Sequence, residues 1–326
     1  MQPTKRKRTS GLTGIELAIA LAALKKLAEK ARQELIMNAM QPVAEEQDPE
    51  LELVEEAEAT VLTQIEELMA VLQARADGPQ SYSFSGMTGE LLEDLKIQFS
   101  GTLALKGDAP GRGALTDNLG NDKLWSATTL LAHLRFLEEL VPRCNVAATR
   151  LWINAFFYRV SAMIPEHLKM ALSIEQVVHK SPHTLSGFID FTAAVMVPAQ
   201  LGSFLERPVL RPNDSVLFVS EAKDVSIDLK KHIPQAVAEM LGCARRAGKK
   251  IVKGVVTDGR SWIFLILTLQ DDGTATYVRS VEINYGRFTT RPSQEGVSLI
   301  SAILAHWILH SHEAFNEPTD FFLAPI

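Results

Sequence analysis

The stretch VLFVSEAK, residues 216–223, is a run of β-prone apolar residues that ends in a glutamate and a lysine two positions apart. Side chains alternate between the two faces of a strand, so Glu221 and Lys223 are expected to point the same way. A second apolar run, GFIDF at 187–191, carries Asp190. If the two runs are neighbouring strands, two carboxylates converge beside one ammonium. That arrangement would suit a divalent metal ion with an adjacent cation.

The regions around these two runs alternate between helix and strand patterns. Two helices come before them, and a helix, three strands and a final helix come after. This order predicts an α/β or α+β fold, in which a mixed central β-sheet is flanked by helices. The expected helices are 124–140, 146–163, 228–247 and 295–310, and the expected strands are 186–197, 215–222, 252–257, 262–269 and 276–282.

The first 80 residues differ in character from the rest of the chain. Apolar residues recur at helical spacing from Leu17 to Leu35 and again from Val54 to Leu72, among many charged residues. Such a narrow apolar seam is typical of a helical hairpin or a coiled-coil-like pairing. The seam is expected either to pack on itself or on the main domain, or to bind a protein partner or a second copy through residues 12–75.

Three segments follow from this pattern. Residues 1–80 are predicted to form the helical extension, with a basic tip at Lys5-Arg6-Lys7-Arg8, and residues 123–326 the main domain. Glycine and proline punctuate residues 81–122, which indicates a flexible connection. The basic tip is consistent with a nuclear import signal and equally with a disordered end.

Composition limits the class of protein. The chain has 326 residues and a formal net charge of −6, from 33 basic and 39 acidic residues, so nucleic acid would have to be bound by a local basic patch. Its two cysteines, Cys144 and Cys243, suggest neither a disulfide framework nor a zinc motif, which favours an intracellular protein. No apolar run approaches the roughly 20 residues of a membrane span, so no membrane contact is expected.

Four features occur in order along residues 124–310. They are Gly187-x-x-Asp190, Glu221-Ala222-Lys223, Gln235 in the following helix, and GVVTDG at 254–259 followed by Trp262. Together they resemble the PD-(D/E)XK nuclease superfamily, which has the restriction-endonuclease-like fold. They look most like a fungal branch, the Crinkler-type C-terminal domains and related uncharacterised fungal proteins. The resemblance implies a metal-dependent nuclease that acts on phosphodiester bonds, with DNA as the expected substrate. A secreted effector is also compatible with the sequence.

The resemblance also implies a role for each site residue. Asp190 and Glu221 would hold Mg²⁺ or Mn²⁺, with the backbone carbonyl of Ala222 as a third ligand. Lys223 would orient the attacking water or the phosphate, and Gln235 would hold the lysine or contact the phosphate. Plainer interpretations stay open. Asp190 could accept a backbone hydrogen bond at a strand end, and Glu221 and Lys223 could form a surface ion pair of little energetic value.

Two groups of basic residues are candidates for contacts with backbone phosphates. One lies at the start of the helix expected over 228–247, and the other lies at its end. The second group has a plainer explanation, because the helix dipole favours cations at a C-terminus. The groups are Lys230 and Lys231 at the start, and Arg245, Arg246, Lys249 and Lys250 at the end.

The sequence departs from the superfamily pattern at one position. The superfamily often carries a carboxylate on the first core helix, but this chain has Val146 where that acid is expected, directly after Asn145. The change puts a second metal position, and catalysis itself, in doubt. The alternative is a catalytically inactive nuclease-like fold that acts as a nucleic-acid or protein binding module.

Overall fold

A computed structural model divides the chain into two compact units, Met1–Ser81 and Tyr82–Ile326. It describes residues 14–39, 61–70, 72–73, 82–142, 145–178, 185–208, 217–223, 228–286, 291–311, 313–315 and 320–324. The basic tip Lys5-Arg6-Lys7-Arg8 lies outside these residues. Among the helices in the described ranges, none has both the length and the apolarity that crossing a bilayer requires.

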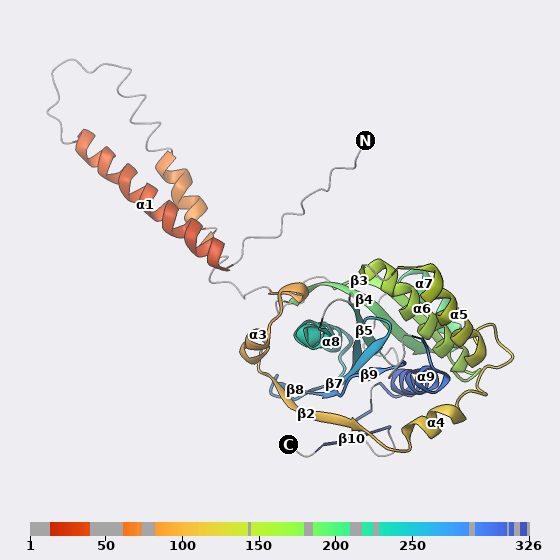
Figure 1. Ribbon diagram of the computed structural model, residues 1–326. Coiled ribbons are helices and arrows are strands. Elements are labelled where there is room, and N and C mark those ends of the chain that lie inside the picture. The colour runs from red at the N-terminus through yellow and green to blue at the C-terminus, as the bar shows by residue number, and fades with distance from the viewer. Residues whose placement is uncertain are drawn as a thin grey trace, which may run out of the picture. The chain divides into compact units, whose positions relative to one another are not determined.

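The described part of the first unit is a pair of helices (Figure 1). Helix α1, Gly14–Ala39, runs in one direction, and the helical residues 61–70 and 72–73 run back beside it (Figure 1). The Arg32 guanidinium forms an ion pair with Glu66, and Nε lies 3.2 Å from Oε1. Leu21 and Ala28 are buried between the helices. The predicted helical extension is therefore an antiparallel hairpin.

The second unit is built on a mixed β-sheet with the strand order β1-β4-β5-β6-β7-β8-β2-β10, to which β3 is added beside β4 and β9 beside β7. Of the described strand pairs, β1/β4, β5/β6 and β2/β8 are parallel and the others are antiparallel. The strands are β1 (Tyr82–Ser83), β2 (Ile97–Leu105), β3 (Lys169–Val178), β4 (Leu185–Met196), β5 (Leu217–Ala222), β6 (Ile251–Thr257), β7 (Ser261–Leu269), β8 (Ala275–Ser280), β9 (Ile283–Asn284) and β10 (Phe321–Leu323).

Helices cover both faces of this sheet (Figure 1), and each face has its own hydrophobic cluster. Helices α5, α6 and α9 pack on one face, and α8 packs on the other. Along β6, Val255 belongs to the first cluster while Val252 and Val256 belong to the second, because successive side chains of a strand point to opposite faces. The helical elements are η1 (Phe84–Gly86), α3 (Gly89–Asp94), α4 (Ala109–Leu115), α5 (Ala127–Leu140), α6 (Val146–Met163), α7 (Pro198–Glu206), η2 (Leu229–His232), α8 (Ile233–Ala247) and α9 (Gln294–Leu309).

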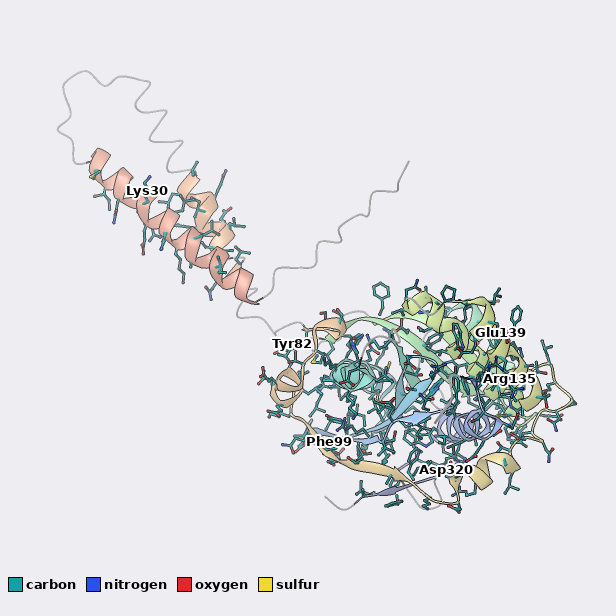
Figure 2. The ribbon with its side chains drawn as sticks, in the orientation of Figure 1. Lys30, Tyr82, Phe99, Arg135, Glu139 and Asp320 are labelled. Atoms are coloured by element: carbon teal, nitrogen blue, oxygen red, sulfur yellow. The ribbon has the colours of Figure 1, made fainter. Side chains whose placement is uncertain are left out.

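The predicted fold class, a mixed central sheet flanked by helices, is confirmed by this arrangement. The prediction of a flexible connection over residues 81–122 is wrong. Residues from Tyr82 onward belong to the second unit, and β2 lies inside its sheet between β8 and β10. Phe99 of β2, labelled in Figure 2, packs against Tyr277 of β8 with 5.4 Å between ring centroids and the ring planes tilted by 52°. Part of this segment forms a strand because it pairs with strands far along the chain. Its own glycines and prolines do not predict that pairing.

Candidate functional site

The first part of the candidate site lies where β4 and β5 stop pairing. Their antiparallel register ends with Phe191 opposite Ser220. Asp190 and Glu221 are the next residues of the two strands beyond that pair. The two predicted metal ligands therefore come from adjacent strands at the same end of the sheet. For Glu221 the structure describes the backbone alone.

The second part is the exit of β5, beside the end of β6. The two strands run parallel as far as Ala222 opposite Thr257. The backbone N–H of Lys223 then donates to the carbonyl oxygen of Thr257 at 2.8 Å, which continues the ladder by one step. In the other direction, the Thr149 hydroxyl of α6 donates to the carbonyl oxygen of Lys223 at 3.2 Å. The lysine backbone is thus held from both sides.

Asp190 lies where the side-chain alternation of β4 shifts by one residue. Ile189 belongs to the hydrophobic cluster under α8, whereas Phe191, two residues later, belongs to the cluster under α6. Regular alternation would put both on the same face. Asp190 forms an ion pair with Arg150 of α6, and the two side chains are only 15% and 25% exposed. No role was predicted for Arg150, yet it is the cation that this carboxylate contacts.

Lys223 is held by Gln235 of α8, and Gln235 is held in turn by Glu239. Nζ of Lys223 donates to Oε1 of Gln235 at 2.9 Å, and Nε2 of Gln235 donates to Oε1 of Glu239, also at 2.9 Å. The Glu239 side chain is fully buried. Because an amide has one accepting and one donating end, the carboxylate of Glu239 fixes which end Gln235 turns toward the lysine. The structure thus brings Lys223 and Gln235 together, as predicted, and adds Glu239 as the next residue in the chain of hydrogen bonds.

A histidine lies beside this lysine at the start of α8. Burial and then the positive charge of Lys223 lower the pKa of His232, and Lys231 adds to this while Asp228 opposes it. Lys230 and Lys231 are exposed in η2, at the same end of the sheet as Lys223. These two lysines are therefore available at the edge of the candidate site.

The other predicted phosphate-binding group lies elsewhere. It spans the last turn of α8 and the residues between that helix and the start of β6, roughly 16 Å of helix away from Gln235. The candidate site is at the opposite end of β6. Lys250 forms an ion pair with Asp271 at 2.7 Å, and both side chains are well exposed. The structure therefore does not bring this group, which is Arg245, Arg246, Lys249 and Lys250, to Asp190 and Lys223.

The metal site itself depends on Glu221. Among the residues that the structure describes, no cluster of three or more His, Cys, Asp or Glu side chains could hold a metal ion. The Glu221 side chain is outside that search. The proposed ligands are two carboxylates and the backbone carbonyl of Ala222. All are hard oxygen ligands, which is the type that Mg²⁺ prefers.

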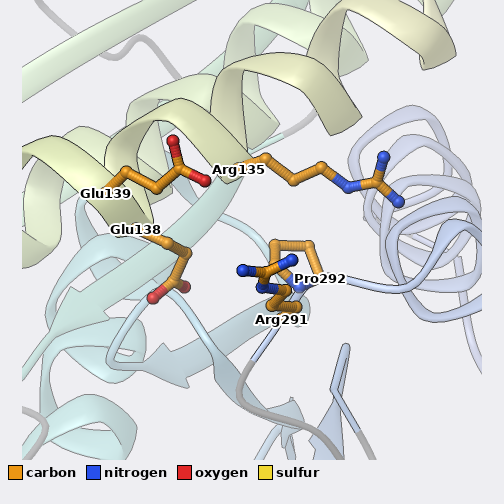
Figure 3. Close-up of a pocket in the computed structure, with 5 residues that line it drawn as sticks. All are labelled: Arg135, Glu138, Glu139, Arg291 and Pro292. Carbon is orange, nitrogen blue, oxygen red and sulfur yellow. The ribbon is translucent and has the colours of Figure 1, made fainter.

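A polar pocket of about 500 Å³ lies at the same end of the sheet. Glu138, which lines it, accepts a hydrogen bond from the Tyr285 hydroxyl at 2.6 Å and forms an ion pair with Arg260 at 3.3 Å. Figure 3 shows residues of α5 on one side and the segment before α9 on the other. This pocket was not predicted from the sequence, because its residues come from distant segments of the chain. They are Arg135, Glu138, Glu139, Arg291 and Pro292.

The turn between β6 and β7 separates the pocket from the candidate site. The Asp258 carboxylate accepts from the backbone N–H groups of Arg260 and Ser261 at 2.8 and 2.7 Å, which closes the turn. Gly259 has φ +80°, and a Cβ there would lie 2.8 Å from Cβ of Trp152 on α6. Only glycine fits this left-handed position against the helix. The turn joins the strands expected over 252–257 and 262–269, and it fixes the end of β6 that holds Lys223.

The chain matches no protein-family model, and no curated protein matches it significantly.

Proposed function

We propose that the second unit is a metal-dependent nuclease-like domain that hydrolyses phosphodiester bonds, with DNA as the expected substrate. One observation carries the proposal: Lys223 is held by Gln235 at the end of the sheet where Asp190 and Glu221 follow the last β4/β5 pair. Asp190 contacts α6 and the Lys223 side chain contacts α8, so the two reach this end of the sheet from opposite faces. Two carboxylates and a lysine at one end of a sheet are the residue types that metal-dependent phosphoryl chemistry uses.

Each residue of the proposed site would have its own role. Asp190, Glu221 and the carbonyl of Ala222 would hold Mg²⁺ or Mn²⁺, which supplies a Lewis acid for the phosphate and a more acidic water. Lys223 would donate from Nζ to a phosphate oxygen and offset the negative charge that develops there. Gln235 holds that Nζ in place. Lys230 and Lys231 would contact backbone phosphates of the nucleic-acid partner.

A second candidate function is a nucleic-acid binding module without turnover. The ion pair between Arg150 and Asp190 favours it, because a guanidinium already neutralises one predicted metal ligand. Val146, in the place of the helix acid, is the first residue of the same helix, α6. In this alternative, Arg150 and Lys223 would bind a phosphate directly.

One assay separates the two functions. The full chain is incubated with supercoiled plasmid in Mg²⁺, in Mn²⁺ and in EDTA, beside Glu221→Ala and the control Asp271→Ala, an exposed acid at the far end of β6. The nuclease predicts cleavage that needs the metal, survives Asp271→Ala and is lost in Glu221→Ala. Intact plasmid in every lane, with labelled DNA retarded in EDTA, would instead support the binding module. Intact plasmid with no retardation would contradict both.

A further inference from the structure

Glu239 is the one acidic residue of α8, and its side chain is fully buried. Its neighbours in the helix, Ala238 and Met240, belong to the hydrophobic cluster under α8. A buried carboxylate is unfavourable unless it has a hydrogen-bond donor and a compensating cation. Gln235, one turn earlier, supplies the donor, and Lys223 lies beyond it as the cation. The acid is therefore tied to the candidate site although its own side chain is closed off from solvent.

The groups at the two ends of this hydrogen-bond chain decide which way the Gln235 amide is turned. An ammonium can only donate and a carboxylate can only accept, whereas a side-chain amide does both. Only one orientation serves both neighbours, with Oε1 toward Lys223 and Nε2 toward Glu239. Without an acceptor at position 239, the amide of the half-buried Gln235 could rotate away from the lysine.

We propose that Glu239 is a positioning residue for Lys223: by fixing Gln235 it holds the ammonium where a phosphate oxygen would bind. This inference rests on the proposed function of the same site. The Lys223 backbone is already held by Thr257 and Thr149. With the backbone and Nζ both fixed, the flexible stem of the lysine has few conformations left. A group that is oriented before the substrate arrives speeds the reaction, so Glu239 contributes to kcat without contacting DNA.

The test compares Glu239→Met and Glu239→Gln with the wild type in the full chain, by plasmid cleavage in Mg²⁺. Methionine suits the apolar surroundings of position 239 but gives Gln235 no strong acceptor. It is expected to lower kcat about tenfold or more and to leave KM within about twofold. Glutamine keeps an acceptor oxygen and should stay within about threefold of the wild-type kcat. Urea denaturation checks that each variant is folded.

A second comparison tests whether Glu239 acts through Gln235. The variant Gln235→Met should lower kcat about as much as Glu239→Met does. In a chain that already carries Gln235→Met, the further change Glu239→Met should alter kcat by less than about twofold, because the acid then has no amide to hold. Two losses that simply multiply would show that Glu239 supports the fold by another route, and would overturn the inference.

Two further results of the cleavage assay would overturn it. One is a kcat equal to that of the wild type in Glu239→Met, and the other is an equal loss in the Met and Gln variants, which would assign the effect to the charge. Both leave the proposed function standing. A wild-type chain that leaves the plasmid intact would overturn the proposed function and this inference with it.

A measurement without metal or DNA tests the positioning independently of cleavage. The order parameter of Lys223 Nζ is recorded by ¹⁵N NMR, and its signal is assigned by its loss in Lys223→Met. The order parameter should fall in Glu239→Met and keep its wild-type value in Glu239→Gln. An unchanged order parameter in Glu239→Met would overturn the positioning role even where the wild-type chain cleaves the plasmid.

Discussion

Replacing Lys223 with methionine is expected to lower the rate of metal-dependent DNA cleavage by about 100-fold or more. The methionine keeps most of the apolar stem and removes the charge that Gln235 holds in position. Removing one preorganised donor to a developing oxyanion typically costs two to three orders of magnitude in rate. The measurement is the initial rate of plasmid nicking at saturating Mg²⁺.

The control is Lys230→Met, which removes a charge from an exposed position of η2 close to the site. It should weaken DNA binding and its salt dependence while leaving the rate at saturating DNA nearly unchanged. Equal rates for Lys223→Met and the wild type would contradict the proposed role of the lysine. So would an equal loss in Lys230→Met, since that would point to binding alone.

Replacing Arg159 with leucine is expected to lower the free energy of unfolding of the second unit by about 3 kcal/mol. Arg159 is 1% exposed on α6, and burial lowers the pKa of its guanidinium. Leucine would leave buried acceptors without their donor, and each such loss costs about 1–3 kcal/mol. The guanidinium donates to four carbonyl oxygens, those of Leu119 and Trp125 at 2.6 and 3.2 Å and those of Thr116 and Asp117 at 3.2 and 3.4 Å.

Urea denaturation followed by tryptophan fluorescence measures this change. The control is Arg135→Leu, which removes an exposed arginine from the neighbouring helix α5. The control should shift the free energy of unfolding by less than about 0.5 kcal/mol. A change below about 1 kcal/mol in Arg159→Leu would mean that the 116–125 segment finds other donors, and would contradict the role of Arg159 as its anchor.

Much of the fold around the site follows from local sequence signals. The expected helix at 146–163 matches α6, because Asn145 caps it by accepting from the N–H of Ala148 at 2.8 Å. Helix α8 ends at Gly248, whose φ of +62° suits a C-terminal cap. Strands β6 and β7 were predicted to within a residue, since both are apolar and a glycine turn joins them.

Two of the strands that were not predicted, β2 and β3, are long, and both are ordered by partners that are distant in the sequence. The β2 segment contains Gly101 at a register shift and looks like a loop on its own. It is a strand because β8 and β10 pair with it on either side. The β3 segment, Lys169–Val178, is only partly apolar and is held by β4 along its whole length. In both cases tertiary pairing overrides weak local propensity.

The site was predictable in its residue types and only partly in its contacts. The contact between Lys223 and Gln235 follows from a strand that leads into a helix nearby in the chain. The partner of Asp190 does not follow, because Arg150 reaches it from α6 across the β4/α6 packing. The cluster at Arg245 shows the opposite error: it is close in sequence to Gln235, but α8 carries it to the other end of the sheet.

The most direct test of the proposed site is a crystal of the full chain soaked in Mn²⁺, with anomalous scattering recorded at the manganese edge. The proposed function predicts one strong peak at about 2.0–2.6 Å from carboxylate oxygens of both Asp190 and Glu221, with Nζ of Lys223 facing the same space. A map in which Asp190 stays paired with Arg150 and manganese binds elsewhere, or nowhere, would contradict it.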